Sequence, residues 1–226
     1  MKPKKIKDLI NYHFTKKKLS VVDCGCHKGH FLKKIGLKKL KSGILVDPID
    51  YKVIQSYNLK NFKYFNLLLG SVNKIQTFKI YSSKYPEWSS INSLGQKSIY
   101  KKNYSKFLYR KVIKKKIKQI TLDKLLFNFK EKFDILKIDC QSTTFNILKG
   151  CKKNLNSKKF KVIIVAINLA DFYKNSKDDF TKISILLNSF GYKLINIANA
   201  HSGKLGLLDY DFKNYKIWTF DAIFML

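Results

Sequence analysis

The segment VVDCGCHKGHF, Val21 to Phe31, gives the clearest indication of the fold. A short β-branched run begins at Leu19 and leads into Asp23. Gly25 and Gly29 then form a turn, and apolar residues at helical spacing follow it. A strand, a glycine turn and a helix in this order are typical of the first unit of a nucleotide-binding α/β sheet. The dinucleotide pattern G-x-G-x-x-G is not met, because Asp23 stands at the first glycine and the last glycine comes one residue late.

The pattern D-x-G-x-x-x-G suits S-adenosylmethionine better than a dinucleotide. This cofactor has no pyrophosphate, and its methionine ammonium and carboxylate call for an acid and for free backbone amides in a tight glycine turn. Asp47 ends the next strand, 24 residues after Asp23, where a carboxylate can accept both ribose hydroxyls. The alternatives are a plain strand–turn–helix with glycines for packing and a surface Asp before a proline turn. We predict these cofactor-binding residues: Asp23, Gly25, Cys26, His27, Gly29 and Asp47.

The rest of the chain alternates short apolar runs with helical stretches, which indicates an α/β sheet with crossover helices. Strands are expected at 19–25, 43–47, 64–70, 75–81, 133–139, 161–168, 192–198 and 218–226, and helices at 5–17, 28–41, 51–58, 144–155 and 178–190. No repeat or Pro/Gly-rich linker interrupts the pattern, so we predict one doubly wound domain over residues 1–226. We expect a leading helix within 1–18, a loop over the active-site end at 82–103, and an antiparallel hairpin of the last two strands at one edge.

The composition favours a soluble, cytoplasmic globular protein. The 226 residues are 45% hydrophobic and 14% aromatic, which allows a core and excludes a disordered chain. The longest apolar stretch, 162–170, is broken by Asn168 and is far shorter than the ~20 residues of a membrane helix. The basic N-terminal stretch lacks the apolar segment of a signal peptide.

The net charge of +31 would ordinarily indicate a nucleic acid or a membrane surface as partner. Arg110 is the only arginine, however, and Lys, Asn, Ile, Tyr and Phe are abundant together, as a genome rich in A and T would produce. A nucleic-acid reader normally keeps arginines for bidentate contacts, so we do not expect a nucleic-acid partner. At low salt the charge should still speed the encounter with an acidic substrate.

Two lysine clusters are expected to form solvated helix faces. A second use, the holding of a phosphorylated or acidic glycan carrier, stays open. The clusters are Lys33, Lys34, Lys38, Lys39 and Lys41, and Lys114, Lys115, Lys116 and Lys118.

The four cysteines, Cys24, Cys26, Cys140 and Cys151, are expected to be free thiols. Cys24 and Cys26 with His30 do not make a four-ligand metal site, because no second C-x-C or H-x-H completes it. We predict no structural metal.

Seven segments are similar, in this order, to those of one known family. They are VVDCGCHKGHF (21–31), VDP (46–48), LLGSVNKIQTF (68–78), EWSSINSL (87–94), ITLDKLL (120–126), LKIDCQSTTFNILKG (136–150) and FDAIFM (220–225). They resemble the FkbM-type S-adenosylmethionine-dependent methyltransferases, and LKIDCQSTTFNILKG is the most specific of them. The resemblance implies a Rossmann-like class I methyltransferase fold: a mostly parallel seven-stranded sheet with helices on both faces and an antiparallel C-terminal strand. It also implies that Gly70 is a cofactor-binding residue.

The chain departs from that family's pattern mainly in the segment after the fourth core strand. The resemblance places glutamates at Gln141, Thr144 and Asn168, a glycine at Ser142 and an asparagine at His27. The segments that would bind the cofactor therefore match the family pattern. The segments that would bind the methyl acceptor lack up to three of its carboxylates.

Two residues are candidate general bases for a hydroxyl acceptor. Asp139 ends the fourth core strand, where this fold places its acceptor-side acid, although an Asp here can instead cap the next helix. His201, between the last two strands, is the second candidate because imidazole titrates near neutral pH; a plain loop residue is the alternative. Tyr85 and Trp88 either wall the acceptor pocket or only anchor their loop.

The resemblance implies an O-methyltransferase that uses S-adenosylmethionine and acts on a hydroxyl of a sugar, glycan or small metabolite. A nucleic-acid methyltransferase is the second hypothesis, suggested by the charge. The segment IDCQSTT opposes it, because it lacks the Asp/Asn-Pro-Pro-aromatic signature of base methylation. A binding protein that keeps the cofactor site but has lost catalysis is the third hypothesis.

Overall fold

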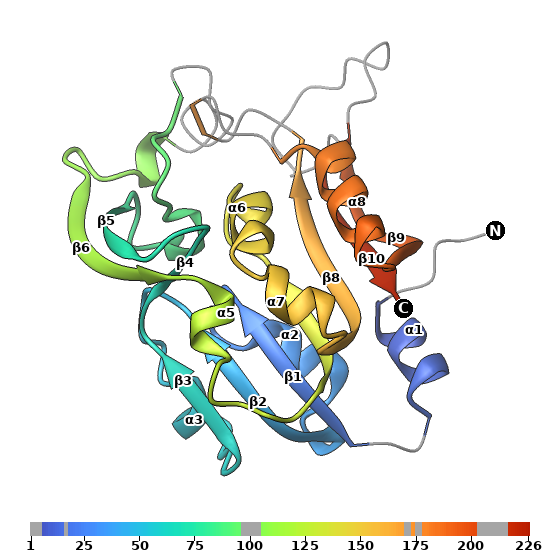
Figure 1. Cartoon of the computed structure of the whole chain (residues 1–226). Helices are drawn as coiled ribbons and strands as arrows, with labels where there is room; N and C mark the ends of the chain where they lie inside the picture. The colour runs from blue at the N-terminus through green and yellow to red at the C-terminus, as the bar shows by residue number, and fades with distance from the viewer. Residues whose placement is uncertain (1–5, 16–17, 96–104, 170–172, 175–177, 203–216) are drawn as a thin grey trace.

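A central sheet carries the fold, and within the described residues it has seven strands in the order β3-β2-β1-β7-β8-β10-β9 (Figure 1). The structure, a computed structural model, describes residues 6–15, 18–95, 105–169, 173–174, 178–202 and 217–226. The strands are β1 (Leu19–Cys24), β2 (Leu40–Val46), β3 (Phe62–Phe65), β7 (Phe133–Ile138), β8 (Phe160–Asn168), β9 (Lys193–Ser202) and β10 (Ile217–Met225). β3, β2, β1, β7 and β8 run parallel, and β10 is antiparallel to both β8 and β9. The expected mostly parallel sheet with an antiparallel C-terminal strand is confirmed.

Helices pack on both faces of the sheet, as expected. One face carries α1 (Ile6–His13), α2 (His30–Ile35) and α3 (Val53–Ser56), and the other carries α5 (Leu122–Leu125), α6 (Thr144–Lys149), α7 (Lys152–Asn156) and α8 (Phe180–Ser189). In Figure 1, α6 and α7 lie in front of the sheet and α2 lies behind it. Short 3₁₀ turns are η1 (Leu37–Lys39), η2 (Pro86–Trp88) and η3 (Ser105–Phe107).

The strand sequences are apolar at successive positions because the sheet is buried on both sides. Val21 and Ile135 pack against α1 and α2, whereas their neighbours Val22 and Leu136 pack against α6, α7 and α8. Successive residues of a strand point to opposite faces, so β1 and β7 supply both cores at once. Each such side chain stabilises the fold by about 1.5–3 kcal/mol when it is fully buried.

Glycines end two of the expected helices early. The helix expected at 28–41 stops at Ile35, because Gly36 follows in a positive-φ conformation, and η1 and β2 take over. The helix expected at 144–155 is divided at Gly150 into α6 and α7. A Cβ at Gly150 would lie 2.1 Å from the carbonyl oxygen of Gly70, so the two chain segments touch there.

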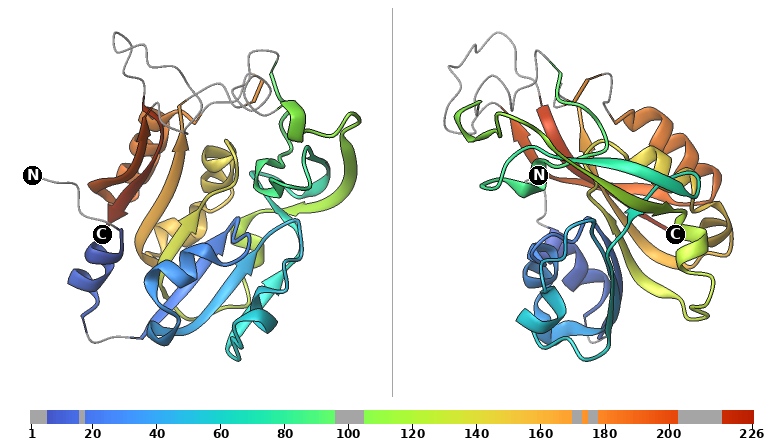
Figure 2. Two further views of the ribbon diagram at one scale, coloured as in Figure 1. Left: turned by 180° about the vertical axis from the view of Figure 1, so that it is seen from behind. Right: turned by 90° about the vertical axis from the view of Figure 1, so that its left-hand side faces the viewer.

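A second sheet lies beside the first, and within the described residues it has three strands in the order β4-β6-β5. They are β4 (Leu68–Leu69), β5 (Lys74–Ile80) and β6 (Ile113–Ile120). β5 agrees with the strand expected at 75–81, whereas the single strand expected at 64–70 is divided between β3 and β4. The right-hand view of Figure 2 shows this sheet crossing one side of the molecule.

The expected helix face at Lys114–Lys118 is wrong, because these lysines lie in β6. Lysine has a low strand preference, so the local sequence gives no strand signal. Antiparallel pairing with β5 over its full length holds β6 extended instead. In the other lysine cluster, Lys33 and Lys34 lie in α2, Lys38 and Lys39 in η1, and Lys41 in β2.

Among the described residues, no helix is long and apolar enough to cross a membrane.

Gly25 joins the ends of three strands. Its N–H donates to the carbonyl oxygen of Val46 on β2 over 2.8 Å, and the N–H of Asp139 donates to Cys24 on β1 over 2.9 Å. A Cβ at Gly25 would lie 2.1 Å from the carbonyl oxygen of Asp139, and φ at Gly25 is +77°. Both the close approach and the backbone conformation therefore require glycine.

We predict that Gly25→Ala lowers the melting temperature far more than Gly36→Ala. Both glycines have positive φ, so both substitutions carry a backbone penalty of about 1–3 kcal/mol. Only at Gly25 does the new methyl group meet a backbone oxygen, since Gly36 has no atom within 4 Å of the added carbon. Thermal unfolding followed by circular dichroism measures both. Equal losses would show that the close approach at Gly25 is unimportant.

Candidate active site

A cavity of about 340 Å³ opens at the carboxyl ends of β1, β2 and β7. Asp23, Asp47 and Asp139 line it from these three strand ends. The opposite wall comes from Phe78 on β5 and from residues of Pro86–Ile91, within the loop expected at 82–103. Ligands of open α/β sheets bind at this edge, beside the point where the strand order reverses, here between β1 and β7. The position and the size both fit a small-molecule site.

Asp23 is a buried carboxylic acid with an unused oxygen. Its side chain is 1% exposed, and its Oδ2 atom has no hydrogen-bond partner. Burial raises the pKa of Asp23 to about 7, although the nearby Lys137 ammonium lowers it in part. A buried polar atom without a protein partner is uncommon in folded proteins, and because Asp23 lines the cavity this atom is available to a ligand.

Asp47 holds the turns on both sides of the strand end. Its Oδ2 accepts the N–H of His27 and its Oδ1 accepts the N–H of Ile49, each over 2.9 Å. Burial raises the pKa of Asp47 to about 6, against the lowering effect of these two bonds. Each carboxylate oxygen keeps a lone pair, so Asp47 can still accept two ligand hydroxyls.

The backbone amides of the glycine turn are already engaged, so the expectation of free amides is wrong at these positions. The N–H groups of Gly25 and Cys26 both donate to the carbonyl oxygen of Val46, over 2.8 and 3.3 Å. The N–H of Gly29 donates to Cys26 over 2.8 Å. Gly25, Cys26 and His27 line the cavity and therefore shape it, and His27 does so at a φ of +46°.

Two of the glycines predicted to bind the cofactor are not among the residues that line the cavity. A Cβ at Gly29 would lie 2.7 Å from the ring of Tyr57, so this glycine allows the turn to pack on the helix that follows β2. A Cβ at Gly70 would lie 2.5 Å from the Gln119 side chain. Both positions serve close packing in the structure.

Lys137 lies among three carboxylates and is almost fully buried. Its Nζ is 3.1 Å from Oδ2 of Asp139 and 3.6 Å from Oδ1 of Asp221. Burial disfavours the ammonium, but Asp139, Asp221 and Asp23 together outweigh this and raise the pKa of Lys137 above its usual value. Lys137 therefore stays charged and fixes the Asp139 carboxylate, whose side chain is 45% exposed.

Asp221 lies next to Lys137, and Asn199 lies next to Asp221. The sequence pattern did not indicate either residue as part of the site. The amide of Asn199 donates to Oδ2 of Asp221 over 2.6 Å. Asn199 has a φ of +50° and lies where the register between β9 and β10 shifts, which is the geometry of a β-bulge. The bulge turns the Asn199 side chain toward Asp221.

The structure does not support the helix-cap interpretation of Asp139. α6 begins at Thr144, and the carboxylate that bonds the backbone there is that of Asp178, not that of Asp139. Asp139 instead pairs with Lys137 at the cavity.

His201 lies in β9, which is separated from β7 by β8 and β10. Its backbone pairs with Thr219. Its side chain lies outside the described residues, so its candidate role stays a prediction.

Asp178 brings a carboxylate to two of the positions where the resemblance places glutamates. It accepts the N–H of Asn168 over 3.0 Å and also bonds the backbone and hydroxyl of Thr144. Burial raises the pKa of Asp178 to about 6. Asp178 links the end of β8 to the start of α6 and does not line the cavity.

At the third position, the Gln141 side chain contacts Tyr173, which in turn contacts Trp88 of the loop expected at 82–103. The hydroxyl of Tyr173 lies 3.1 Å from Oε1 of Gln141 and 2.6 Å from the carbonyl oxygen of Trp88. Trp88 stacks on Tyr85 with 4.2 Å between ring centroids. Neither of these two aromatics lines the cavity, which favours the anchoring interpretation.

All four cysteines are within the described residues and have free thiols. Burial raises the pKa of Cys24, Cys26, Cys140 and Cys151. Among the described residues, no group of three or more His, Cys, Asp or Glu side chains is arranged to hold a metal ion.

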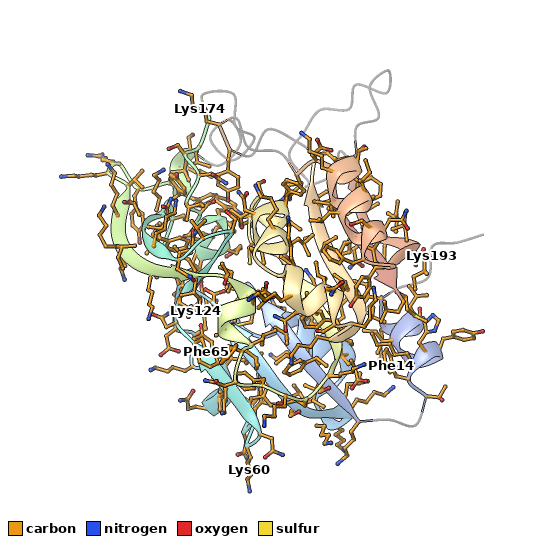
Figure 3. All side chains as sticks on the ribbon, viewed as in Figure 1. Phe14, Lys60, Phe65, Lys124, Lys174 and Lys193 are labelled. Atoms are coloured by element: carbon orange, nitrogen blue, oxygen red, sulfur yellow. The ribbon has the colours of Figure 1, made fainter. Side chains whose placement is uncertain are left out.

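The cavity is acidic in a strongly basic chain. The chain has 46 Lys and Arg against 15 Asp and Glu, yet Asp23, Asp47, Glu87 and Asp139 line the cavity. Among the residues that the structure describes, Lys137 is the only lysine or arginine lining it. Lysines such as Lys60, Lys174 and Lys193 lie exposed at the margin of the molecule (Figure 3). The cavity therefore favours a ligand that carries positive charge.

The strand order and the helices on both faces of the sheet are those of the Rossmann-like class I methyltransferase fold. Residues 23–194, well over half of the chain, match the family model of the methyltransferase FkbM domain. This chain belongs to the methyltransferase FkbM family. Comparison with curated proteins gives no match.

Solved structures are similar to this chain at low sequence identity. The methyltransferase FkbM from Methylobacillus flagellatus KT is 12% identical, with a TM-score of 0.54 over 98% of this chain and 48% of that chain. This chain thus spans about half the length of that protein. A ribosomal protein L11 methylase from Lactobacillus delbrueckii subsp. bulgaricus is 13% identical, with a TM-score of 0.44 over 96% of this chain and 75% of its own. A TehB-like SAM-dependent methyltransferase from Corynebacterium glutamicum is 12% identical, with a TM-score of 0.42 over 97% and 85%.

We predict that Asp23→Asn stabilises the protein relative to the wild type more at pH 8 than at pH 5. In the folded protein Asp23 keeps its proton up to about pH 7, whereas in the unfolded chain it loses it near the ordinary value of 3.8. Ionisation of Asp23 therefore destabilises the fold as the pH rises from about 4 to 7, and this effect is fully present above 7. Asparagine does not ionise, so the free energy of unfolding should differ by on the order of 2 kcal/mol or more between the two pH values.

Urea unfolding at both pH values measures this effect. Asp8→Asn, which changes an exposed side chain of α1, is the control. A pH-independent difference for Asp23→Asn would contradict the raised pKa.

Proposed function

We propose that this protein transfers a methyl group from S-adenosylmethionine to a hydroxyl oxygen of a sugar, glycan or small metabolite. The observation that carries the proposal is the acidic cavity at the carboxyl ends of β1, β2 and β7 in a chain of net charge +31. Membership of the FkbM family supports it.

The residues of the cavity fit this cofactor. S-adenosylmethionine carries a sulfonium and an ammonium group, and the acidic lining favours both charges. The unpaired Oδ2 of Asp23 is suited to accept a hydrogen bond from the ammonium. This bond would offset the free-energy cost of burying that oxygen without a partner. Asp47, with a free lone pair on each oxygen, is suited to the two ribose hydroxyls.

Asp139 is the candidate general base. When bound, the cofactor supplies an already activated methyl group, so the protein mainly positions the acceptor, excludes water and removes a proton. Asp139 is the most exposed of the three aspartates at the strand ends, so an acceptor hydroxyl can reach it. Lys137 pairs with this carboxylate and with Asp221, and the amide of Asn199 donates to Asp221.

We predict that calorimetric titration shows micromolar binding of S-adenosylmethionine and that Asp23→Asn and Asp47→Asn each weaken it at least about tenfold. Tenfold corresponds to about 1.4 kcal/mol, less than the usual value of a hydrogen bond to a charged group. Asp8→Asn, at an exposed site on α1, should leave the affinity unchanged. Absence of binding by the wild type would refute the proposed function.

A second candidate is a protein that binds the cofactor without turnover. The observation in its favour is that none of Gln141, Thr144 and Asn168 gives the cavity a carboxylate, and Asp178 does not line it.

Turnover separates the two candidates. We predict release of S-adenosylhomocysteine with at least one member of a panel of glycan and small hydroxyl acceptors, and a loss of about 10²–10⁴-fold in turnover for Asp139→Asn. The affinity of this variant for S-adenosylmethionine should change little, because Asp23 and Asp47 are intact. Turnover that Asp139→Asn leaves unchanged would remove Asp139 from the mechanism, and binding without any turnover would favour the second candidate.

A further inference from the structure

The β5–β6 ribbon, Lys74–Ile80 paired with Ile113–Ile120, is a cationic surface beside the cavity. Its two strands contain six lysines and no acidic residue: Lys74, Lys79, Lys114, Lys115, Lys116 and Lys118. All except the half-buried Lys79 are exposed. Among the described residues, no carboxylate pairs with any of them. The ribbon crosses the side of the molecule seen in the right-hand view of Figure 2.

The pairing register sorts the side chains of the ribbon into two faces. Lys114, Lys116 and Lys118 alternate along β6, so they share the outer face, with about 6.6 Å between successive lysines. Phe78, on the opposite face of β5, is buried and lines the cavity. The same two strands therefore present a row of positive charges outward and a wall of the cavity inward.

The row of lysines is electrostatically unfavourable in the protein alone. Lys114 lies directly opposite Lys79 in the antiparallel ladder, and like charges in such a pair destabilise a sheet. Burial lowers the pKa of Lys79, and the charge of Lys114 lowers it further. A polyanion bound along the outer face would relieve this repulsion.

The side chains of the ribbon favour an acidic glycan over a nucleic acid. Apart from the lysines, its exposed side chains include Ile75 and Ile113, at 64% and 42% exposure, and its single aromatic residue, Phe78, is buried. Bases of single-stranded nucleic acids stack on exposed aromatic rings, and none is present on the ribbon. The ribbon also contains no arginine for bidentate contacts.

We propose that the outer face of the β5–β6 ribbon binds an anionic glycan chain whose hydroxyl-bearing unit enters the cavity. This inference rests on the proposed function. It assigns the charged groups of the substrate to the lysines of β6 and its reacting, uncharged part to the acidic cavity beyond Phe78.

The experiment compares two triple variants with the same net charge. Lys114→Gln/Lys116→Gln/Lys118→Gln removes the outer row, and Lys34→Gln/Lys38→Gln/Lys41→Gln removes three exposed lysines around η1. The probes are a fluorescent heparin oligosaccharide, a neutral dextran oligosaccharide and single-stranded oligouridylate, followed by anisotropy at several salt concentrations. We expect the ribbon variant to bind heparin about tenfold or more weaker with a smaller salt slope, and the control variant to bind within about twofold of wild type.

Three outcomes overturn the proposal. They are equal losses in the two variants, which would mean a general charge effect; dextran binding as tight as heparin; and oligouridylate bound more tightly than heparin through the ribbon. Titration of the same variants with S-adenosylmethionine separates this proposal from the proposed function, because the ribbon substitutions should not change that affinity. No cofactor binding by any variant is the failure of the proposed function, whereas normal cofactor binding with equal heparin losses is the failure of the ribbon proposal alone.

Discussion

The close approach of Gly25 to the backbone of Asp139 is the constraint on which the site depends. A side chain at this position would collide with the Asp139 carbonyl oxygen, and the same residue donates its N–H to Val46. The ends of β2, β1 and β7 are thereby held side by side. Asp23, Asp47 and Asp139 come to one cavity because each stands at one of these three ends. The burial that surrounds them is what raises the pKa values of Asp23 and Asp47.

Most of the central sheet could be predicted because its strands carry their own signals. Both faces are covered, so β1, β2 and β7 contain apolar runs, and these strands are followed by Gly25, Asp47 and Asp139. The second sheet could not be predicted in full. β6 is rich in lysine and is extended only because it pairs with β5, about forty residues earlier in the chain. The division between β3 and β4 was not predicted for a similar reason. Both segments are largely apolar, and they differ only in the strands with which they pair.

The residues of the candidate site that lie at the ends of core strands could be predicted from the sequence. Those contributed by the later strands β9 and β10 could not. Asp23, Asp47 and Asp139 stand in the local pattern, and the structure places them together. Asp221 reaches Lys137 from β10, and Asn199 reaches Asp221 from a bulge in β9. No local sequence pattern indicates these two contacts. The turn amides were expected to be free because the sequence does not reveal that Val46 accepts two of them.

The contrast between an acidic cavity and a basic surface has a consequence for kinetics. A cationic ligand that approaches from a distance meets the repulsion of a chain with net charge +31 and feels the attraction of the cavity only at its mouth. Salt screens the long-range repulsion much more than the buried contacts, since the Debye length falls to about 8 Å at physiological ionic strength. Added salt should therefore quicken the entry of such a ligand while its escape rate changes little, the reverse of ordinary electrostatic steering.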